Sequence, residues 1–482
     1  MACAAVPPLR RWAESAGDAL AVTSTFSGPG PALGPRLRRA VPRLRHPAQF
    51  VVAGFAAAVA VGTLLLLLPV SRSATAGASL IDALFVATSA VCVTGLSTVD
   101  TPVYWSGFGQ AVILGLIQVG GFGIMALATL LGLFVSRKVG LRSRLNTAAE
   151  IKALGISDVR RVLVGVARTS LLFEAAGAVV LTLRFATAYD EPVGRAVWLG
   201  VFHSVSAFNN AGFALFSDNM IGFATDPVIS LALCVLVVSG GLVFPVLFEL
   251  RRAWRTPRRW SLHTKIVTAM TGLLLVVGPV MFLLLEWSNP KTLGPLGVGG
   301  KAVAGIFQGV QPRTAGFNSV NTGALNPETL LGTDVLMFIG GGSAGTAGGI
   351  KVTTFAVLLF VIVTEVRGDR SVTAFNRRIP REVQRQALSV ALLAVAVVVA
   401  GTMTMLLLTP FGLDAVLFEV VSAFATVGLS TGITAQVGTA GQVLLVVMMF
   451  LGRLGPITLA AALALRSRPR LYDLPEERPI IG

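Results

Sequence analysis

The residues in this sequence whose types and spacing could do chemistry lie in four short segments, each built around one glycine. An extended backbone run held at membrane depth can present carbonyl oxygens that replace the water shell of a monovalent cation. Glycine suits such a run because its backbone reaches positive φ without steric cost. The segments read VCVTGL (91–96), FNNAGF (208–213), RTAGF (313–317) and FATVGLS (424–430).

The residues before these glycines recur as well, which indicates an internal repeat. The glycines Gly95, Gly212, Gly316 and Gly428 are 117, 104 and 112 residues apart, too far for a solenoid module. In the first, second and fourth segments a serine lies six residues before the glycine and a phenylalanine ten residues before it. These residues are Ser89 and Phe85, Ser206 and Phe202, and Ser422 and Phe418. The third segment is looser, with Val310 and Ile306 at the two positions.

Composition indicates a membrane protein. Of 482 residues 54% are hydrophobic and 13% charged, whereas about a quarter of the residues of soluble proteins are charged. Eight apolar stretches could each cross a hydrocarbon core of about 30 Å. They cover residues 50–70, 108–135, 162–187, 228–250, 265–286, 333–363, 386–409 and 442–465.

A shorter, half-apolar piece carrying the glycine segment lies between the members of each pair of stretches. We therefore predict an all-α membrane protein of four span, pore loop, span repeats around a single central pore, with eight transmembrane helices and four re-entrant pore helices. Asp82 and Asp414 are expected to begin two of the pore helices, because a carboxylate favours the positive helix end.

The net charge of +16 is explained by topology. Arginines cluster in the N-terminal tail, in segments 137–161, 251–265 and 367–385, and after Arg466. With eight spans, these five segments all fall on one side, while acids such as Asp226 and Asp334 fall on the other. This asymmetry predicts a multi-pass cell-membrane protein with both termini in the cytoplasm, and it disfavours nucleic acid as a partner.

The sequence gives little support for an enzymatic function. Cys3, Cys92 and Cys234 show no paired spacing. The G-x-G-x-x-G match within Gly340–Gly345 lies inside an apolar stretch without the strand–helix context of a dinucleotide site, and no Walker A motif is present. We expect no catalytic residue and no organic cofactor.

Residues Gly340–Lys351 read GGGSAGTAGGIK, and a stable helix does not tolerate this glycine density. A span broken here must line an aqueous space, because lipid cannot satisfy the freed backbone groups. Glycines at matching distances in the other repeats leave open a plainer role in close helix packing. They are Gly120 and Gly121, Gly240 and Gly241, and Gly452 and Gly455.

Several ionisable residues lie at membrane depth, where a charge usually faces a partner or a cavity. Arg453 is expected to bind carbonyls of the broken third-repeat span, with snorkelling to the cytoplasmic surface as the alternative. Arg313 is expected to stabilise the C-terminus of the third pore helix. Glu174 is expected to make a helix–helix contact, and Glu419 to have polar neighbours in the fourth pore helix.

These motifs resemble the Trk/Ktr/HKT superfamily of potassium transporters over residues 50–482. The resemblance rests on the four glycine segments, the Gly340–Lys351 loop, Arg453 and the tail Pro475–Gly482. Eight spans make the chain more similar to the Ktr membrane subunit than to the Trk one, which typically has ten. Cys92 in the first segment, the loose third repeat and the basic N-terminal arm depart from the pattern.

The resemblance implies that potassium is the transported ion and that backbone carbonyls alone bind it. The implied filter residues are Val93, Thr94, Gly95, Asn210, Ala211, Gly212, Thr314, Ala315, Gly316, Thr426, Val427 and Gly428. It also implies an intramembrane gate below the filter, made by Gly340, Gly341, Gly342, Ser343, Gly345, Gly348, Gly349, Lys351 and Arg453.

The predicted organisation follows the repeats. It comprises a basic cytoplasmic arm (1–48), repeats at 49–136, 137–252, 253–366 with the gate loop 340–351, and 367–466, and a cytoplasmic tail (467–482).

The leading functional hypothesis is channel-like potassium uptake driven by the membrane potential. The resemblance implies a homodimer of membrane subunits controlled by a cytosolic nucleotide-binding regulatory ring, and it leaves open whether sodium stimulates uptake. The alternative is a secondary transporter that couples potassium to sodium or protons. It would normally show broken helices in corresponding halves and binding acids at the midplane.

Overall fold

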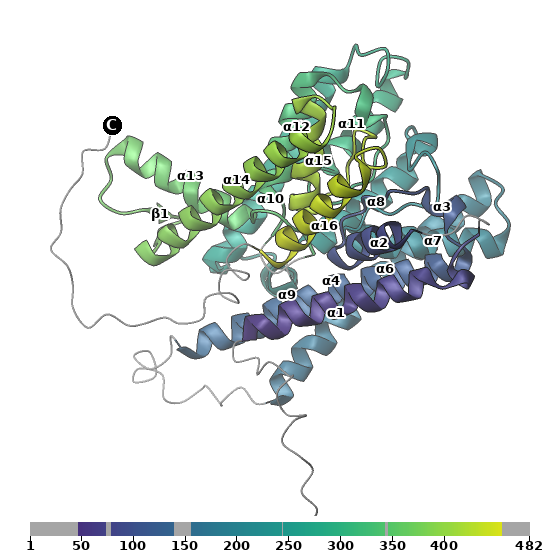
Figure 1. Cartoon of the computed structure of the whole chain (residues 1–482). Helices are drawn as coiled ribbons and strands as arrows, with labels where there is room; N and C mark the ends of the chain where they lie inside the picture. The colour runs from purple at the N-terminus through teal and green to yellow at the C-terminus, as the bar shows by residue number, and fades with distance from the viewer. Residues whose placement is uncertain (1–46, 74–78, 139–155, 243, 343–345, 456–482) are drawn as a thin grey trace, which may run out of the picture. The chain divides into compact units, whose positions relative to one another are not determined.

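The computed structural model describes residues 47–73, 79–138, 156–242, 244–342 and 346–455, almost all of them helical or in short loops between helices (Figure 1). The described residues all belong to one compact unit, His46–Gly482. The predicted N-terminal arm and C-terminal tail lie outside the described residues. The long helices are α1 (Pro47–Leu67), α4 (Gly107–Lys138), α6 (Ile156–Ala188), α8 (Pro227–Gly241), α9 (Phe244–Ala253), α10 (Leu262–Glu286), α12 (Pro327–Ile339), α13 (Val352–Arg367), α14 (Arg381–Leu408) and α16 (Gly438–Leu454).

Four shorter helices carry the glycine segments at their C-terminal ends. They are α2 (Leu80–Cys92), α7 (Val193–Phe208), α11 (Val298–Val310) and α15 (Leu413–Ala425). Each packs against the long helix before it, and the long helix after it packs against the next short helix along the chain. These last contacts join α4 to α7, α8 to α11, α12 to α15 and α16 to α2, the last of which closes the cycle.

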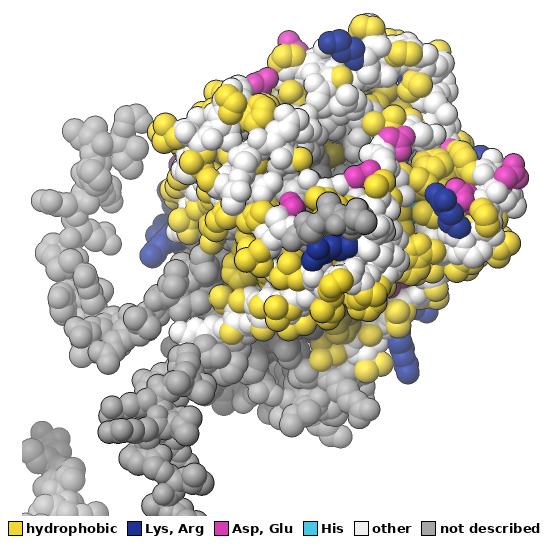
Figure 2. All heavy atoms as spheres, turned by 45° about the vertical axis from the view of Figure 1, so that its right-hand side comes forward, with side chains coloured by type: hydrophobic (Ala, Val, Ile, Leu, Met, Phe, Trp, Pro, Cys, Tyr) yellow, Lys and Arg dark blue, Asp and Glu magenta, His cyan; other side chains and the backbone are white. Residues whose placement is uncertain are grey.

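Three helices within the described ranges are each long and apolar enough to cross a membrane by themselves: Leu163–Ala188 in α6, α10 and α14. The pair α8 and α9 qualifies together, with a bend of 101° between them. Hydrophobic side chains cover much of the face seen in Figure 2. Strongly exposed examples are Leu284 and Leu407, which are 76% and 86% exposed. Exposed aliphatic side chains of this size suit contact with lipid rather than water.

The short helices begin and end at residues that the local sequence specifies. Ser79 caps α2, and its hydroxyl accepts the Asp82 N–H at 3.1 Å, so the carboxylate lies in the first turn as expected. The helix ends at Cys92, and the next residue, Val93, is left-handed. The Val93 N–H then donates to Ala90 and the Thr94 N–H to Ser89, the paired bonds of a Schellman ending.

The glycine-rich positions of the long helices behave differently in each repeat. In α4 the helix continues through Gly120 and Gly121, whereas α8 ends at Gly241. The span predicted at 333–363 is broken, because α12 ends at Ile339, Gly340 takes φ +63°, and α13 starts at Val352. Of the loop between them, residues 343–345, which include the predicted gate residues Ser343 and Gly345, lie outside the described residues.

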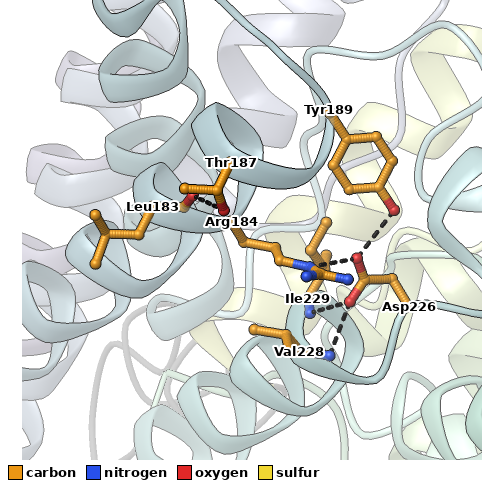
Figure 3. A network of polar contacts seen from close by, with 7 residues as sticks. All are labelled: Leu183, Arg184, Thr187, Tyr189, Asp226, Val228 and Ile229. Carbon is orange, nitrogen blue, oxygen red and sulfur yellow. Dashed lines mark hydrogen bonds and ion pairs between the residues drawn. The ribbon is translucent and has the colours of Figure 1, made fainter.

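A polar network joins α6 to α8 beyond their apolar parts (Figure 3). The Asp226 carboxylate caps α8 through the N–H groups of Val228 and Ile229, at 2.9 and 3.2 Å. It also accepts hydrogen bonds from Arg184 Nε at 2.8 Å and from the Tyr189 hydroxyl at 2.9 Å. This network ties the end of one long helix to the start of the next.

The remaining elements are short. A hairpin of β1 (Thr373–Ala374) and β2 (Arg377–Arg378) links α13 to α14 in antiparallel register. The helix α3 (Thr101–Tyr104) and the single turns η1 (Pro69–Ser71), η2 (Ile221–Phe223), η3 (Pro257–Arg259) and η4 (Thr322–Ala324) complete the connections.

Candidate functional site

The four glycine segments share an unusual backbone conformation. Two residues before each glycine the backbone is left-handed, at Val93, Asn210, Thr314 and Thr426, with φ between +50° and +68°. The glycines themselves take φ between +72° and +96°. Three of the four non-glycine residues are β-branched, for which positive φ is a genuine outlier. Strain of this kind costs about 1–3 kcal/mol per residue and gathers at functional sites.

The four glycines form a closed ring, which we call the glycine ring. A Cβ added to any one of them would clash with the carbonyl oxygen of the residue before the next glycine in the cycle. The pairs are Gly95 with Ala211, Gly212 with Ala315, Gly316 with Val427, and Gly428 with Thr94. Segments more than 100 residues apart in sequence therefore meet at van der Waals distance around one axis.

Polar atoms at this ring are left free. Among the described residues, no N–H or O–H group donates to the carbonyl oxygens of Thr94, Ala211, Ala315 or Val427. The buried hydroxyls of Thr94, Thr314 and Thr426 have no hydrogen-bond partner either. Buried carbonyls and hydroxyls are normally satisfied, so these atoms are available to a cation or to water.

The serine that recurs six residues before the glycine anchors the segment. Ser89 Oγ accepts the Gly95 N–H at 3.0 Å, and Ser422 Oγ accepts the Gly428 N–H at 3.1 Å. In the second segment, Ser206 instead donates to the Phe213 carbonyl at 2.8 Å. The third segment has Val310 at this position and therefore lacks this tie.

A second anchor supports the residue three positions after the glycine in each segment. The Leu215, Ser319 and Thr431 N–H groups donate to His203 Nε2, Gln308 Oε1 and Glu419 Oε1, at 3.0–3.1 Å. In the first segment, the Thr98 hydroxyl donates to Asp82 at 2.7 Å. Sequence analysis missed His203 and Gln308, although a polar side chain eight or nine residues before the glycine in three repeats was a usable signal.

The glycines of the long helices pack against the ends of the short ones. A Cβ on Gly120, Gly240 or Gly452 would clash with the carbonyl oxygen four residues before the ring glycine of the same repeat. Close packing through small residues, the plainer alternative, is therefore what these three positions show. The carbonyls belong to Val91, Phe208 and Phe424.

The glycine-rich loop lies against the ring residues. A Cβ on Gly348 would clash with the Thr426 hydroxyl, and one on Gly349 would lie 3.2 Å from the Ala425 methyl group. The Thr346 hydroxyl and the Asn210 amide are 3.0 Å apart. The loop thus contacts the left-handed residues of both the second and the fourth segments.

Arg453 holds this loop from the other side. Its guanidinium is buried, donates to the Thr346 carbonyl, and reaches the Gly120 carbonyl at 3.2 Å. Lys351 closes the loop by donating to the Ala347 carbonyl. The expected bond between Arg453 and carbonyls of the broken span is confirmed, and the snorkelling alternative is wrong.

The other intramembrane ionisable residues have mostly structural partners. Glu174 accepts from Gln118 and Asn209 at 3.1 Å, the expected helix–helix contact. Glu419 of α15 also bonds to Ser430 and Thr434, the polar neighbours that were expected of it. Arg313 differs from expectation, since its guanidinium reaches Thr271 of α10 at 3.3 Å rather than the C-terminal carbonyls of α11.

A family model described as cation transport protein, TrkH, matches residues 28–469. The chain belongs to the TrkH family of cation transport proteins. This family is one of transporters rather than enzymes, and together with the apolar helices it places the chain in a membrane.

Relatives of this TrkH-family chain match almost end to end. The Ktr system potassium uptake protein B of Bacillus subtilis is 39% identical over 422 residues, 87% of this chain and 93% of the relative. The protein of the same name from Vibrio alginolyticus is 39% identical over 438 residues, covering 90% and 94%. The potassium/sodium uptake protein NtpJ of Enterococcus hirae is 31% identical, covering 92% and 99%.

The fold is also found in a solved structure. The crystal structure of the potassium transporter TrkH from Vibrio parahaemolyticus superposes with a TM-score of 0.70, covering 89% of this chain and 87% of that one at 17% identity. At this identity the similarity supports the fold alone.

Proposed function

We propose that this TrkH-family protein takes up potassium through a channel-like pore whose selectivity filter is the glycine ring. The observation that carries the proposal is the closed cycle of glycine-to-carbonyl contacts, with free carbonyl and hydroxyl oxygens at the ring. Carbonyl rings can replace the hydration shell of a monovalent cation. The ligands are the backbone carbonyls of the three residues ending at each ring glycine, the twelve filter residues predicted from sequence.

The cargo is proposed from the relatives. Two relatives at 39% identity are named potassium uptake proteins, and one at 31% is named a potassium/sodium uptake protein. Potassium is therefore the ion we assign to the ring, and sodium is the competitor to test. The repeats at 49–136, 137–252, 253–366 and 367–466 would each contribute one quarter of the pore, giving eight spans and four re-entrant pore helices.

The loop 340–351 would act as the gate. It contacts Asn210 and Thr426 at the ring, and its Thr346 carbonyl accepts from Arg453, which also donates to the Gly120 carbonyl. A loop anchored by a few hydrogen bonds can be displaced at smaller cost than a packed helix, because fewer contacts must break. We assign to Arg453 the role of holding the loop in the blocking position.

The regulatory arrangement follows from the relatives' description as parts of a Ktr system. We propose a homodimer in the cell membrane with both termini in the cytoplasm, controlled by a separate cytosolic nucleotide-binding ring. The arginine-rich segments 251–259 and 367–381 would face that ring.

The experiment is rubidium-86 uptake into proteoliposomes held at negative internal potential, with sodium titrated as competitor. Gly316→Ser should lose or relax selective uptake, because its side chain would enter the space of the Val427 carbonyl. Arg453→Ala should raise uptake by freeing the loop. Gly115→Ser is the matched control, since a Cβ there has open space around it.

One observation favours the alternative, a secondary transporter that couples potassium to sodium or protons. Two long helices are interrupted, at Gly241 and at Gly340, and broken helices build the ion sites of many such transporters. If uptake needs a sodium or proton gradient and does not respond to the membrane potential, the protein works by alternating access and not as a conducting pore.

A further inference from the structure

Five exposed arginines lie close together in the segment 251–259, between the end of α9 and the start of α10. They are Arg251, Arg252, Arg255, Arg258 and Arg259. Within the described residues, none of their guanidinium groups forms an ion pair or donates a hydrogen bond. The segment therefore presents a concentrated positive charge that no acid of the described chain neutralises.

The acid nearest in sequence, Glu249 of α9, has other partners. Its carboxylate accepts the Ser261 N–H at 2.7 Å and the Ser261 hydroxyl at 2.8 Å, and it also bonds to Thr264. The Trp260 indole donates to the Ala253 carbonyl at 2.9 Å. These bonds tie the end of α9 to the start of α10, so the arginines between them are carried on a folded turn.

The segment lies where a spanning helix enters the membrane. The helix α10 begins at Leu262, directly after the segment, and is long and apolar enough to cross a membrane by itself. The helix α9, which precedes the segment, is bent by 101° from α8 and so does not continue the direction of that helix. The arginines are therefore held at the membrane surface, beside the first turn of α10.

An exposed tryptophan lies among these arginines. Trp254 is 66% exposed, and the Arg255 guanidinium carbon lies 4.8 Å from the centre of its ring. Tryptophan is enriched at the boundary between hydrocarbon and water, because its ring is both apolar and polar and sits at the level of the headgroups. Clusters of about four to eight basic residues directly beside a spanning helix attract anionic lipids. Both features indicate the same kind of surroundings.

We propose that the segment 251–259 binds the headgroups of anionic phospholipids in the leaflet where α10 begins. A guanidinium donates two parallel hydrogen bonds to a phosphate group, which suits arginine to this ligand. A lipid fits better than a soluble anion, because further along α10 Leu273 and Val276 are 50% and 61% exposed and face the acyl chains. The inference does not depend on the ion that the protein carries. A protein partner on the same side, such as the ring proposed above, is the other candidate, and the test distinguishes the two.

The test is photolabelling of the full chain, without any partner protein, in phosphatidylcholine vesicles. The probes are phosphatidylglycerol and phosphatidylcholine that carry the same diazirine next to the headgroup, each added in trace amount. The readout is the ratio of phosphatidylglycerol to phosphatidylcholine labelling in peptides that cover 251–262. This ratio should be about tenfold in the wild type, the scale of one or two arginines at an anionic headgroup. It should fall toward one when Arg255→Gln, Arg258→Gln and Arg259→Gln are combined, and it should persist when the same three residues are changed to lysine.

The second arginine-rich segment, 367–381, provides the matched control. It also carries five arginines, but three of them line a pocket together with two acids, which offset part of their charge. The pocket residues are Arg370, Arg378, Arg381, Glu365 and Asp369. Changing these three arginines to glutamine removes the same charge and should leave the ratio at 251–262 unchanged.

Three results would overturn the proposal. The first is a ratio near one in the wild type, or no labelling of 251–262 by either probe. The second is a ratio that is unchanged in the glutamine variant of 255, 258 and 259, which would leave the ring as the partner of this segment. The third is an equal fall in both glutamine variants, which would reflect net charge alone. A failure of rubidium uptake bears on the proposed function and not on this surface.

Discussion

At the residue scale, the ring segments depend on side chains that support the backbone from behind. His203, Gln308 and Glu419 accept an N–H three residues past the ring glycine, each from within its own short helix. His203 can do so because its Nδ1 lies 2.7 Å from the Leu199 carbonyl, so the proton is on Nδ1 and Nε2 is free to accept. An imidazole, an amide and a carboxylate thus accept the equivalent backbone hydrogen bond in three segments.

Because an amide serves in the third repeat, Glu419→Gln should keep potassium selectivity, whereas Glu419→Leu should lower the rubidium-to-sodium uptake ratio up to about tenfold. The expected size is that of a lost hydrogen bond to a charged group. Proteoliposome uptake in mixed cations gives the ratio. The control is Glu286→Leu, at a buried acid that bonds to the loop after α10 and to the start of α12, and not to the ring. Equal ratios for the leucine and glutamine variants of Glu419 would argue against a positioning role.

Asp226 shows how a charged residue stabilises the end of α6 and the start of α8. Burial raises the pKa of its carboxyl group, but hydrogen bonds from Arg184, Tyr189 and two backbone N–H groups outweigh burial and lower that pKa. Because the pKa of Asp226 is lower in the folded protein, its ionised carboxylate adds to the free energy of unfolding. This stabilisation is complete above the ordinary pKa of 3.8, and it is lost as the pH falls through the lower pKa of the folded state.

Asp226→Ala should therefore lower the free energy of unfolding by about 1–2 kcal/mol at neutral pH, from the lost helix cap and a partly exposed ion pair. The difference from wild type should vanish in strong acid. Thermal melting in detergent from neutral pH to below pH 4 measures it. Glu191→Ala, in a partly exposed pair with Arg195, should change the melting temperature little. A deficit in Asp226→Ala that is unchanged below pH 3 would contradict this account.

At the scale of elements, the long helices α4, α8 and α16 each approach the short helix of their own repeat through a glycine. Gly452 of α16 lies so close to Phe424 that any Cβ would overlap the Phe424 carbonyl group. The contact involves backbone rather than a flexible side chain, so no rotamer change can relieve it. The distance between α15 and α16 is therefore set by the absence of a side chain.

Gly452→Ala should destabilise the protein by about 1–3 kcal/mol, the usual cost of overpacking. Gly115→Ala in α4, where a Cβ meets nothing within 4 Å, should be neutral or stabilising by up to about 1 kcal/mol, because alanine favours the helix. Melting temperatures in the same detergent compare the two. A melting temperature for Gly452→Ala at or above that of wild type would contradict the packing argument.

At the scale of the whole molecule, the charge distribution predicts orientation. The segment 367–381 at the end of α13 and start of α14 carries five arginines. Asp190 and Glu191 lie between α6 and α7. The positive-inside tendency puts the first region in the cytoplasm and the second outside.

A single cysteine at Ser371 in a cysteine-free background should react with a membrane-impermeant maleimide only in inside-out vesicles, and one at Ser217 only in right-side-out vesicles. A permeant maleimide should label both in either preparation and serves as the control for reactivity. The reverse pattern would invert the proposed topology.

Several features could be predicted from the sequence because they depend on residue type. Few charges and many long apolar stretches suffice to indicate a membrane protein. The glycine density of 340–351 cannot be helical, and the structure breaks the helix there. The ring glycines were identified because only glycine reaches their conformation without strain and because their spacing recurs. A buried arginine such as Arg453 requires carbonyl partners, and these were found in the broken span.

Other features were decided only by tertiary structure, because they depend on contacts between residues far apart in sequence. Each ring glycine faces a carbonyl of the next segment because the four segments pack in a closed ring. No local sequence pattern specifies that ring. The glycines in α4, α8 and α16 were ambiguous until the neighbouring carbonyls were located. That Asp334 is buried, at 7% exposure, likewise depends on how α12 to α15 pack.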